Sequence, residues 1–147
     1  MNAIASCRET TRSPDETVAL GRTLAADLVA GDIVLLCGAM GAGKTYLAKG
    51  LIAGLGGGAE DDVASPAYDI VHQFPGREIV FHYDLFRLQH LSGEDIEWMM
   101  ELLQQNGVHV IEWGDRIEGL LRRPFVKITI DFGDGDERII DIVGARA

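Results

Sequence analysis

The chain has 147 residues, 47% of them hydrophobic and 24% charged, as is typical of a single folded globular domain. Its 23 acidic and 13 basic side chains give a net charge of −10, which disfavours direct binding of nucleic acid because that binding depends on neutralised phosphates. No apolar stretch approaches the roughly 18 residues of a membrane helix, and two cysteines, Cys7 and Cys37, make no disulfide framework.

Residues 1–12 contain no apolar core of a secretory signal. Together with the sparse cysteines, this leads us to expect a cytoplasmic protein. We expect one domain over residues 1–147, with residues 1–12 as a candidate disordered segment.

The first predicted element is a helix that begins after Ser13. Ser13 is a suitable N-cap, Pro14 suits the first helical position, and Glu16 can close a capping box. Gly31 predicts the end of the helical region. The buried stripe at helical spacing consists of Leu20, Leu24 and Leu28.

A glycine-rich motif then follows a short apolar run. Residues 33–37, Ile-Val-Leu-Leu-Cys, predict a buried parallel strand. Residues 38–45, Gly-Ala-Met-Gly-Ala-Gly-Lys-Thr, fit the phosphate-binding P-loop pattern G-x-x-x-x-G-K-[ST]. Apolar residues recur at helical spacing from residue 44 to residue 55, so the motif has the strand–loop–helix context that it requires.

The P-loop predicts a site for a nucleoside triphosphate with Mg²⁺. Glycines let backbone N–H groups curl around phosphate oxygens, and the helix N-terminus adds partial positive charge. We expect Lys44 to reach the β- and γ-phosphates and the Thr45 hydroxyl to bind Mg²⁺. The predicted nucleotide-binding residues are Gly38, Ala39, Met40, Gly41, Ala42, Gly43, Lys44, Thr45, Tyr46 and Trp113.

The rest of the chain alternates strands and helices. A hairpin of strands 68–74 and 79–83 is predicted around a Pro-Gly turn, and a helix is expected from Ser92 or Gly93 to Asn106. Further strands are predicted over 108–111, 126–132 and 138–143, with a short helix over 116–121. This alternation predicts an α/β fold: a single P-loop NTPase-like layered domain with a mixed, partly parallel central sheet and flanking helices.

Two of the predicted strands end in a carboxylate, Asp84 and Glu112. Ligands of open α/β sheets lie at the carboxyl ends of the strands, so we expect both side chains near the P-loop. A P-loop ATPase needs a carboxylate for Mg²⁺ and a group that orients or deprotonates the attacking water. Either residue fits either role. The predicted catalytic set is Lys44, Asp84 and Glu112, and the predicted metal set is Thr45, Asp84 and Glu112.

Two neighbours of these carboxylates have more than one interpretation. His82 shares a strand face with Asp84 and can form a metal pair with it, but a hydrogen-bonded core histidine is the favoured interpretation. Trp113 either stacks on a base or a partner, or packs in the core. One basic cluster forms either a solvated face or a docking patch: Arg116, Arg122, Arg123 and Lys127.

Taken together, these segments resemble the bacterial TsaE family, also called YjeE, over nearly the whole chain. The P-loop alone is common to many families, whereas the ordered set of motifs is specific. The motifs are Gly31-Asp32, Gly41-Ala42-Gly43-Lys44-Thr45, Ser65-Pro66, His82-Tyr83-Asp84-Leu85-Phe86-Arg87-Leu88 and Glu112-Trp113-Gly114-Asp115.

The resemblance implies a small P-loop ATPase of tRNA threonylcarbamoyladenosine (t6A) biosynthesis. It implies ATP and Mg²⁺ as cofactors, hydrolysis to ADP and phosphate that depends on partners, and work with the TsaD and TsaB proteins. It also implies contact with tRNA only through that complex. By the family's pattern, Lys44 and Thr45 bind phosphates and Mg²⁺, and the two strand-end carboxylates serve metal binding and hydrolysis.

The chain departs from the family's pattern at three positions. Ala39 stands where the family usually has Asp, and Tyr46 and Ala67 stand where it usually has Thr. Residues 65–68 occupy the place of a γ-phosphate sensor, where a threonine would offer a hydroxyl to the metal or the phosphate. Ala67 therefore keeps open an alternative: a non-catalytic module that binds ATP as a docking signal and hydrolyses it negligibly.

Other nucleotide-dependent classes fit less well. The sequence lacks the Asn-Lys-x-Asp motif that binds guanine in GTPases. Leu91-Ser92-Gly93-Glu94 imitates the signature of an ABC-type ATPase, but a helix cap explains it better. A small-molecule kinase needs an acceptor pocket and a lid, for which 147 residues leave little room.

Overall fold

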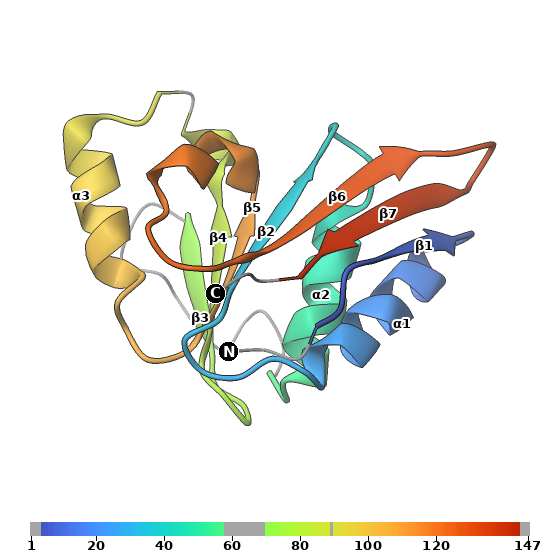
Figure 1. The fold of residues 1–147 in the computed structure, drawn as a ribbon, viewed down its shortest axis with the longest axis horizontal. Coiled ribbons are helices and arrows are strands. Elements are labelled where there is room, and N and C mark those ends of the chain that lie inside the picture. Colours follow the sequence, from blue (N-terminus) through green and yellow to red (C-terminus); the bar gives the residue numbers. More distant parts are fainter. Residues whose placement is uncertain (1–3, 58–69, 89, 145–147) are drawn as a thin grey trace.

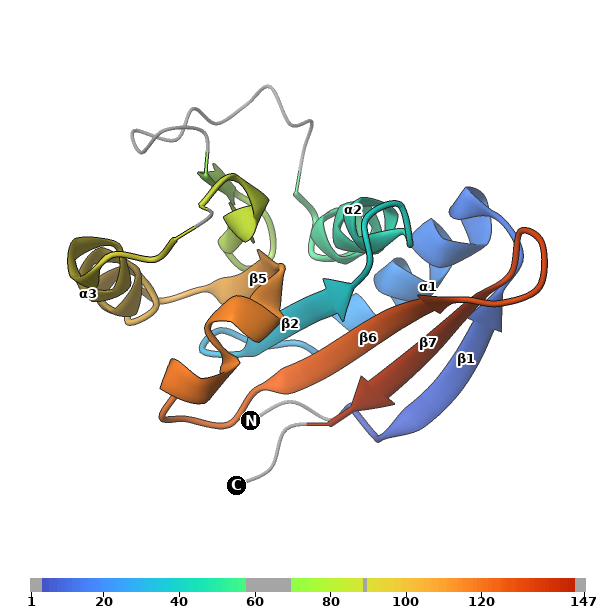
Figure 2. The same cartoon turned by 90° about the horizontal axis from the view of Figure 1, so that it is seen from above.

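The computed structural model describes residues 4–57, 70–88 and 90–144 and contains one seven-stranded sheet with helices on both faces (Figures 1 and 2). The strands are β1 (Cys7–Thr11), β2 (Ile33–Gly38), β3 (Val71–Phe74), β4 (Val80–Asp84), β5 (Val108–Glu112), β6 (Val126–Phe132) and β7 (Arg138–Val143). The helices are α1 (Pro14–Ala25), α2 (Lys44–Gly54) and α3 (Gly93–Leu102), with 3-10 turns η2 (Leu85–Arg87), η3 (Gly114–Arg116) and η4 (Glu118–Leu120).

The strand order is β1-β7-β6-β2-β5-β4-β3. The central strand β2 runs parallel to both β5 and β6, and β4 runs parallel to β5, whereas the two outer hairpins and β1 pair antiparallel. This confirms the predicted α/β fold with a mixed, partly parallel sheet. Because β2, β4 and β5 are parallel, their carboxyl ends lie at one edge, which is where the P-loop begins (Figure 1).

The predicted helix signals form local hydrogen bonds. Ser13 caps α1, since its hydroxyl accepts from the Glu16 N–H at 3.1 Å, but the Glu16 carboxylate accepts from the Arg12 N–H and not from Ser13. α1 ends at Ala25, before the predicted stop at Gly31. α3 also ends early, at Leu102, and a capping box between Ser92 and Asp95 begins it.

Two sequence expectations differ from the structure. Residues 7–11 fall in the segment expected to be disordered, but they form β1, an edge strand paired with β7. The side chains of β1 are exposed except for Thr11, so the strand has no apolar periodicity that a sequence pattern could detect. It is held by backbone pairing with β7 and by an ion pair of 2.6 Å between Arg8 and Asp141. The short helix expected over 116–121 is instead the pair of 3-10 turns η3 and η4.

α1 and α2 lie side by side over one face of the sheet (Figure 2). Glycines stand at their contact: a Cβ on Gly50 would lie 2.1 Å from the Val18 carbonyl oxygen, and one on Gly21 would lie 2.6 Å from that of Leu47. The backbones of α1 and α2 therefore approach more closely than residues with larger side chains allow, and this packing fixes the position of α2, the helix that follows the P-loop.

Each face of the sheet packs its own core. Val34 and Val110 face α1 and α2, whereas Leu35 and Ile111 face α3 and the 3-10 turns. Alternation along the strands places His82, Asp84 and Glu112 on the face that α2 covers. Within the described ranges, every helix is too short or too polar to cross a bilayer.

Candidate nucleotide-binding site

The P-loop joins the end of β2 to the start of α2 and depends on glycine geometry. Gly38, Gly41 and Gly43 have φ angles of 139°, 80° and 117°, a region that residues with a Cβ rarely adopt. A Cβ on Gly38 would also lie 2.3 Å from the Ile130 carbonyl oxygen on β6. Gly43 gives α2 no side-chain cap, so the first N–H groups of the helix remain available to an anion.

Lys44 is drawn into the P-loop. Its ammonium donates to the carbonyl oxygens of Gly38 at 2.6 Å and Ala39 at 2.8 Å, and it lies 4.2 Å from the centre of the Trp113 ring. The residue is only 5% exposed, and this burial lowers the pKa of the ammonium, a shift that the negative charge of Glu112 opposes. The cation is therefore held beside the loop by neutral carbonyls, which phosphate oxygens can replace.

Glu112 connects three elements at the end of β5. Its Oε1 accepts from the Thr45 hydroxyl at 3.0 Å, and its Oε2 is 2.6 Å from His82 Nε2. Glu112 as a whole is 4% exposed, so both carboxylate oxygens take their partners from the protein. This arrangement brings β4, β5 and α2 together around one carboxylate.

Asp84 ends β4 directly opposite Glu112 in the parallel register. Its carboxylate accepts from the Phe86 N–H at 3.1 Å and so caps the turn η2. Arg116 fixes the same turn by donating to the carbonyl oxygens of Leu85, at 2.6 Å, and of Leu88. Asp84 is half-buried and one of its oxygens has a local partner, so it is the more accessible of the two strand-end carboxylates.

A cavity of about 220 Å³ unites most of the predicted site. Gly38, Ala39 and Ala42 do not line it; the first two hold Lys44, and Ala42 accepts a hydrogen bond from Arg138. Phe86, which belongs to the motif of residues 82–88, also lines the cavity, although the sequence predicted no role for it. The lining residues are Met40, Gly41, Gly43, Lys44, Thr45, Tyr46, Asp84, Phe86, Glu112 and Trp113.

Trp113 has a φ of 61°, and among the described residues it is the one non-glycine with a positive φ. This unusual backbone turns the chain directly after Glu112 and presents the indole to the cavity. The ring also packs against Phe86, with a centroid separation of 5.3 Å, and under Arg116. Trp113 thus both packs and lines the site, and stacking on a base stays a prediction.

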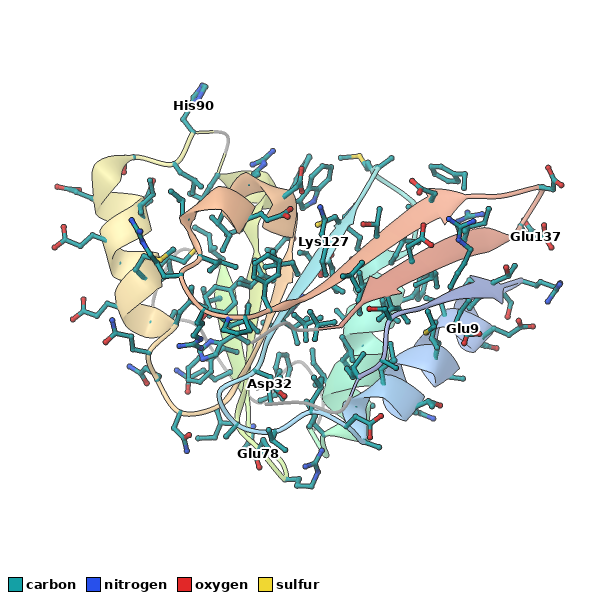
Figure 3. The ribbon with its side chains drawn as sticks, in the orientation of Figure 1. Glu9, Asp32, Glu78, His90, Lys127 and Glu137 are labelled. Atoms are coloured by element: carbon teal, nitrogen blue, oxygen red, sulfur yellow. The ribbon has the colours of Figure 1, made fainter. Side chains whose placement is uncertain are left out.

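Two of the chain's four histidines, His90 and His109, lie away from this centre. His109 is fully buried and bonds to the Tyr83 hydroxyl and the Gln105 carbonyl, and His90 points away from the protein (Figure 3). His82 is hydrogen-bonded and buried, as its favoured interpretation holds, but its partner is the site carboxylate Glu112.

Three of the four residues of the predicted basic cluster form hydrogen bonds or an ion pair within the protein. Arg116 bonds the carbonyls of η2, Arg123 donates to the Leu103 carbonyl, and Lys127 pairs with Glu118 at 2.8 Å. The predicted sensor at residues 65–68, with Ala67, lies outside the described residues.

The residues fit a nucleotide with Mg²⁺. Gly38, Gly41 and Gly43 have the positive φ angles that let backbone N–H groups turn toward a phosphate, and the Lys44 ammonium lies beside the loop. The Thr45 hydroxyl, Glu112 and Asp84 supply the oxygen donors that Mg²⁺ prefers, and a site with few protein carboxylates leaves the remaining positions to phosphate and water.

The chain is similar to proteins named for tRNA threonylcarbamoyladenosine biosynthesis. Residues 11–140 match the family model described as "Threonylcarbamoyl adenosine biosynthesis protein TsaE". The chain is 34% identical over 129 residues to the tRNA threonylcarbamoyladenosine biosynthesis protein TsaE of Treponema pallidum, covering 87% of this chain and 94% of the relative. It is 35% identical over 131 residues to the protein of the same name from Bacillus subtilis, covering 88% and 80% of the two chains.

A solved structure has the same fold. The crystal structure of YdiB from Bacillus subtilis superposes with a TM-score of 0.76 at 26% identity, covering 99% of this chain and 90% of that one. The family match spans most of the chain and the fold agrees throughout, so this protein belongs to the TsaE family.

Proposed function

We propose that this protein binds ATP with Mg²⁺ and hydrolyses it to ADP and phosphate, as an accessory protein of tRNA t6A biosynthesis. One observation carries the proposal: the P-loop residues Lys44 and Thr45 and the strand-end Glu112 meet at one cavity. The family match and the printed names of the relatives support the pathway.

Different side chains of the site would bind the phosphates, hold Mg²⁺ and activate the attacking water. Lys44 exchanges two neutral carbonyl partners for charged phosphate oxygens, which are the stronger acceptors. Thr45, with Asp84 or Glu112, would hold Mg²⁺. When bound, Mg²⁺ neutralises negative charge on the phosphates. The carboxylate that does not hold the ion is placed to orient the attacking water and accept its proton.

We propose that the nucleotide state controls association with the TsaD and TsaB proteins, and that tRNA is reached only through that complex. The net charge of −10 opposes direct binding of RNA. Arg116, Arg123 and Lys127 are engaged in internal hydrogen bonds or an ion pair, so these cations are not free to neutralise phosphates.

A second candidate function rests on Ala67, which replaces the threonine usual in the family. In that case the protein binds ATP as a docking signal and hydrolyses it negligibly. Turnover separates the two functions, because both require binding and only the first releases phosphate.

The direct test compares Lys44→Ala with Lys49→Ala. Both lysines belong to α2, but Lys49 is exposed and lies outside the P-loop. Calorimetry with Mg-ATP and a phosphate-release assay should show that Lys44→Ala loses at least about tenfold in affinity or turnover, because it removes the charge facing the phosphates. Lys49→Ala should retain both within about twofold. Equal behaviour of the two variants would refute the site.

A further inference from the structure

His82 is the buried partner of the site carboxylate. Its Nε2 lies 2.6 Å from Glu112 Oε2, and the two side chains are 11% and 5% exposed. Glu112 Oε1 accepts from Thr45 at the same time. The two oxygens of one carboxylate are thus held by two donors on different elements, β4 and α2.

The strand register explains why a residue at this position reaches Glu112. His82 pairs with Val110 and Asp84 pairs with Glu112, so His82 lies one step back along the same face of the sheet. From there its Nε2 comes within 2.6 Å of the Glu112 Oε2 on the neighbouring strand. Asp84, directly opposite, instead turns to the Phe86 N–H.

Hydrogen-bond donors on both oxygens fix the orientation of a carboxylate, whereas a single donor on one oxygen leaves the carboxylate free to rotate. With His82 alone removed, Oε2 would be left buried without a donor, which is unfavourable for a charged oxygen. The side chain would then turn toward another partner, and the Lys44 ammonium attracts it electrostatically. Rotation of the Glu112 side chain toward Lys44 or toward another partner would move Oε1 away from Thr45, the predicted Mg²⁺ ligand.

We propose that His82 is a positioning residue of the ATPase: it fixes the Glu112 carboxylate so that Oε1 faces the Thr45 hydroxyl. This proposal rests on the proposed function. It assigns His82 a role beyond packing: the residue does not itself line the cavity, and it acts through Glu112, which does. Loss of such an outer partner commonly lowers metal affinity or activity by about 10–100-fold.

The experiment compares His82→Gln with His82→Asn at one fixed pH. A glutamine amide can place its nitrogen near the position of histidine Nε2, whereas the shorter asparagine cannot reach it. His109→Gln is the matched control, since His109 is a buried, hydrogen-bonded histidine on β5 that does not contact Glu112. For each protein we would measure kcat, KM for ATP, the Mg²⁺ concentration for half-maximal ATP binding by calorimetry, and the melting temperature.

His82→Asn should lower kcat at least about tenfold and raise the Mg²⁺ requirement, with KM for ATP within about threefold of the parent. His82→Gln should recover most of both losses, and His109→Gln should change only the melting temperature. Parent-like kcat and Mg²⁺ requirement in His82→Asn, whatever its melting temperature, would overturn the proposal. If the parent binds Mg-ATP without hydrolysing it, the ATPase function fails, while the Mg²⁺ requirement still tests the role of His82.

Discussion

The ammonium of Lys44 lies 4.2 Å from the centre of the Trp113 ring, across the cavity that the P-loop forms. A cation over an indole face is an attractive contact of about 0.5–2 kcal/mol. On the proposed function, a bound triphosphate would redirect Lys44 to phosphate oxygens, and the surroundings of Trp113 would change when the site fills.

Trp113 fluorescence should therefore report nucleotide. The chain has two tryptophans, and the other, Trp98, lies on α3 away from the cavity. Adding Mg-ATP should change the emission of the parent and of Trp98→Phe, whereas Trp113→Phe should give no response. A response that persists in Trp113→Phe and vanishes in Trp98→Phe would place the nucleotide elsewhere.

The strand-end carboxylates should separate binding from chemistry. Asp84→Asn and Glu112→Gln preserve shape and remove charge, and each should lower turnover at least about tenfold. At least one of the two should still bind ATP, because the P-loop holds the phosphates. Asp95→Asn, which changes a carboxylate in the capping box of α3, serves as the control and should hydrolyse at the parental rate. Parental turnover in both site variants would contradict their assignment.

Local sequence patterns predicted most of the residues that line the cavity, because the main parts of the cavity are local in the sequence. The P-loop, Lys44 and Thr45 are contiguous, and Asp84 and Glu112 each end an apolar run, which places them at one edge of a parallel sheet. The His82–Glu112 bond joins residues from different strands, so no spacing along the chain encodes it.

The features that the sequence did not predict also depend on contacts between distant segments. β1 has exposed side chains and owes its place to pairing with β7, near the far end of the chain. Phe86 enters the cavity because Asp84 caps its turn and Arg116, from η3, binds the turn's carbonyls. Neither contact produces a periodic pattern in the sequence.

The close contact of α1 with α2 predicts a strong effect of a single methyl group. In Gly50→Ala the new Cβ would lie 2.1 Å from the Val18 carbonyl oxygen, so the helices must separate. We expect a loss of about 1–3 kcal/mol in the free energy of unfolding, measured in urea. Gly93→Ala, at the first position of α3 with nothing within 4 Å of the new Cβ, should be neutral or slightly stabilising. A Gly50→Ala protein as stable as Gly93→Ala would contradict the packing.

His109 should make stability depend on pH. Burial lowers its pKa to about 4 from an ordinary value of 6.5. Between these pH values His109 is protonated in the unfolded chain but neutral in the folded protein, so protonation favours unfolding. The contribution of neutral His109 to the free energy of unfolding is therefore complete above pH 6.5 and is lost as the pH falls toward 4. Urea unfolding across this range should give a flatter pH dependence for His109→Gln than for the parent. His90→Gln, which changes a histidine that points into solvent, should follow the parent. Identical slopes for parent and His109→Gln would show that His109 is not held neutral.

The most direct test of the proposed function is reconstitution of tRNA t6A formation with the TsaD and TsaB proteins, with tRNA in excess over enzyme. With this protein and Mg-ATP we predict t6A formation over many turnovers. Without it, or with Lys44→Ala in its place, multiple turnover should be lost, because the proposed ATP hydrolysis resets the assembly between turnovers and needs the Lys44 cation beside the phosphate loop. Equal multiple-turnover product with and without this chain would contradict the proposed role.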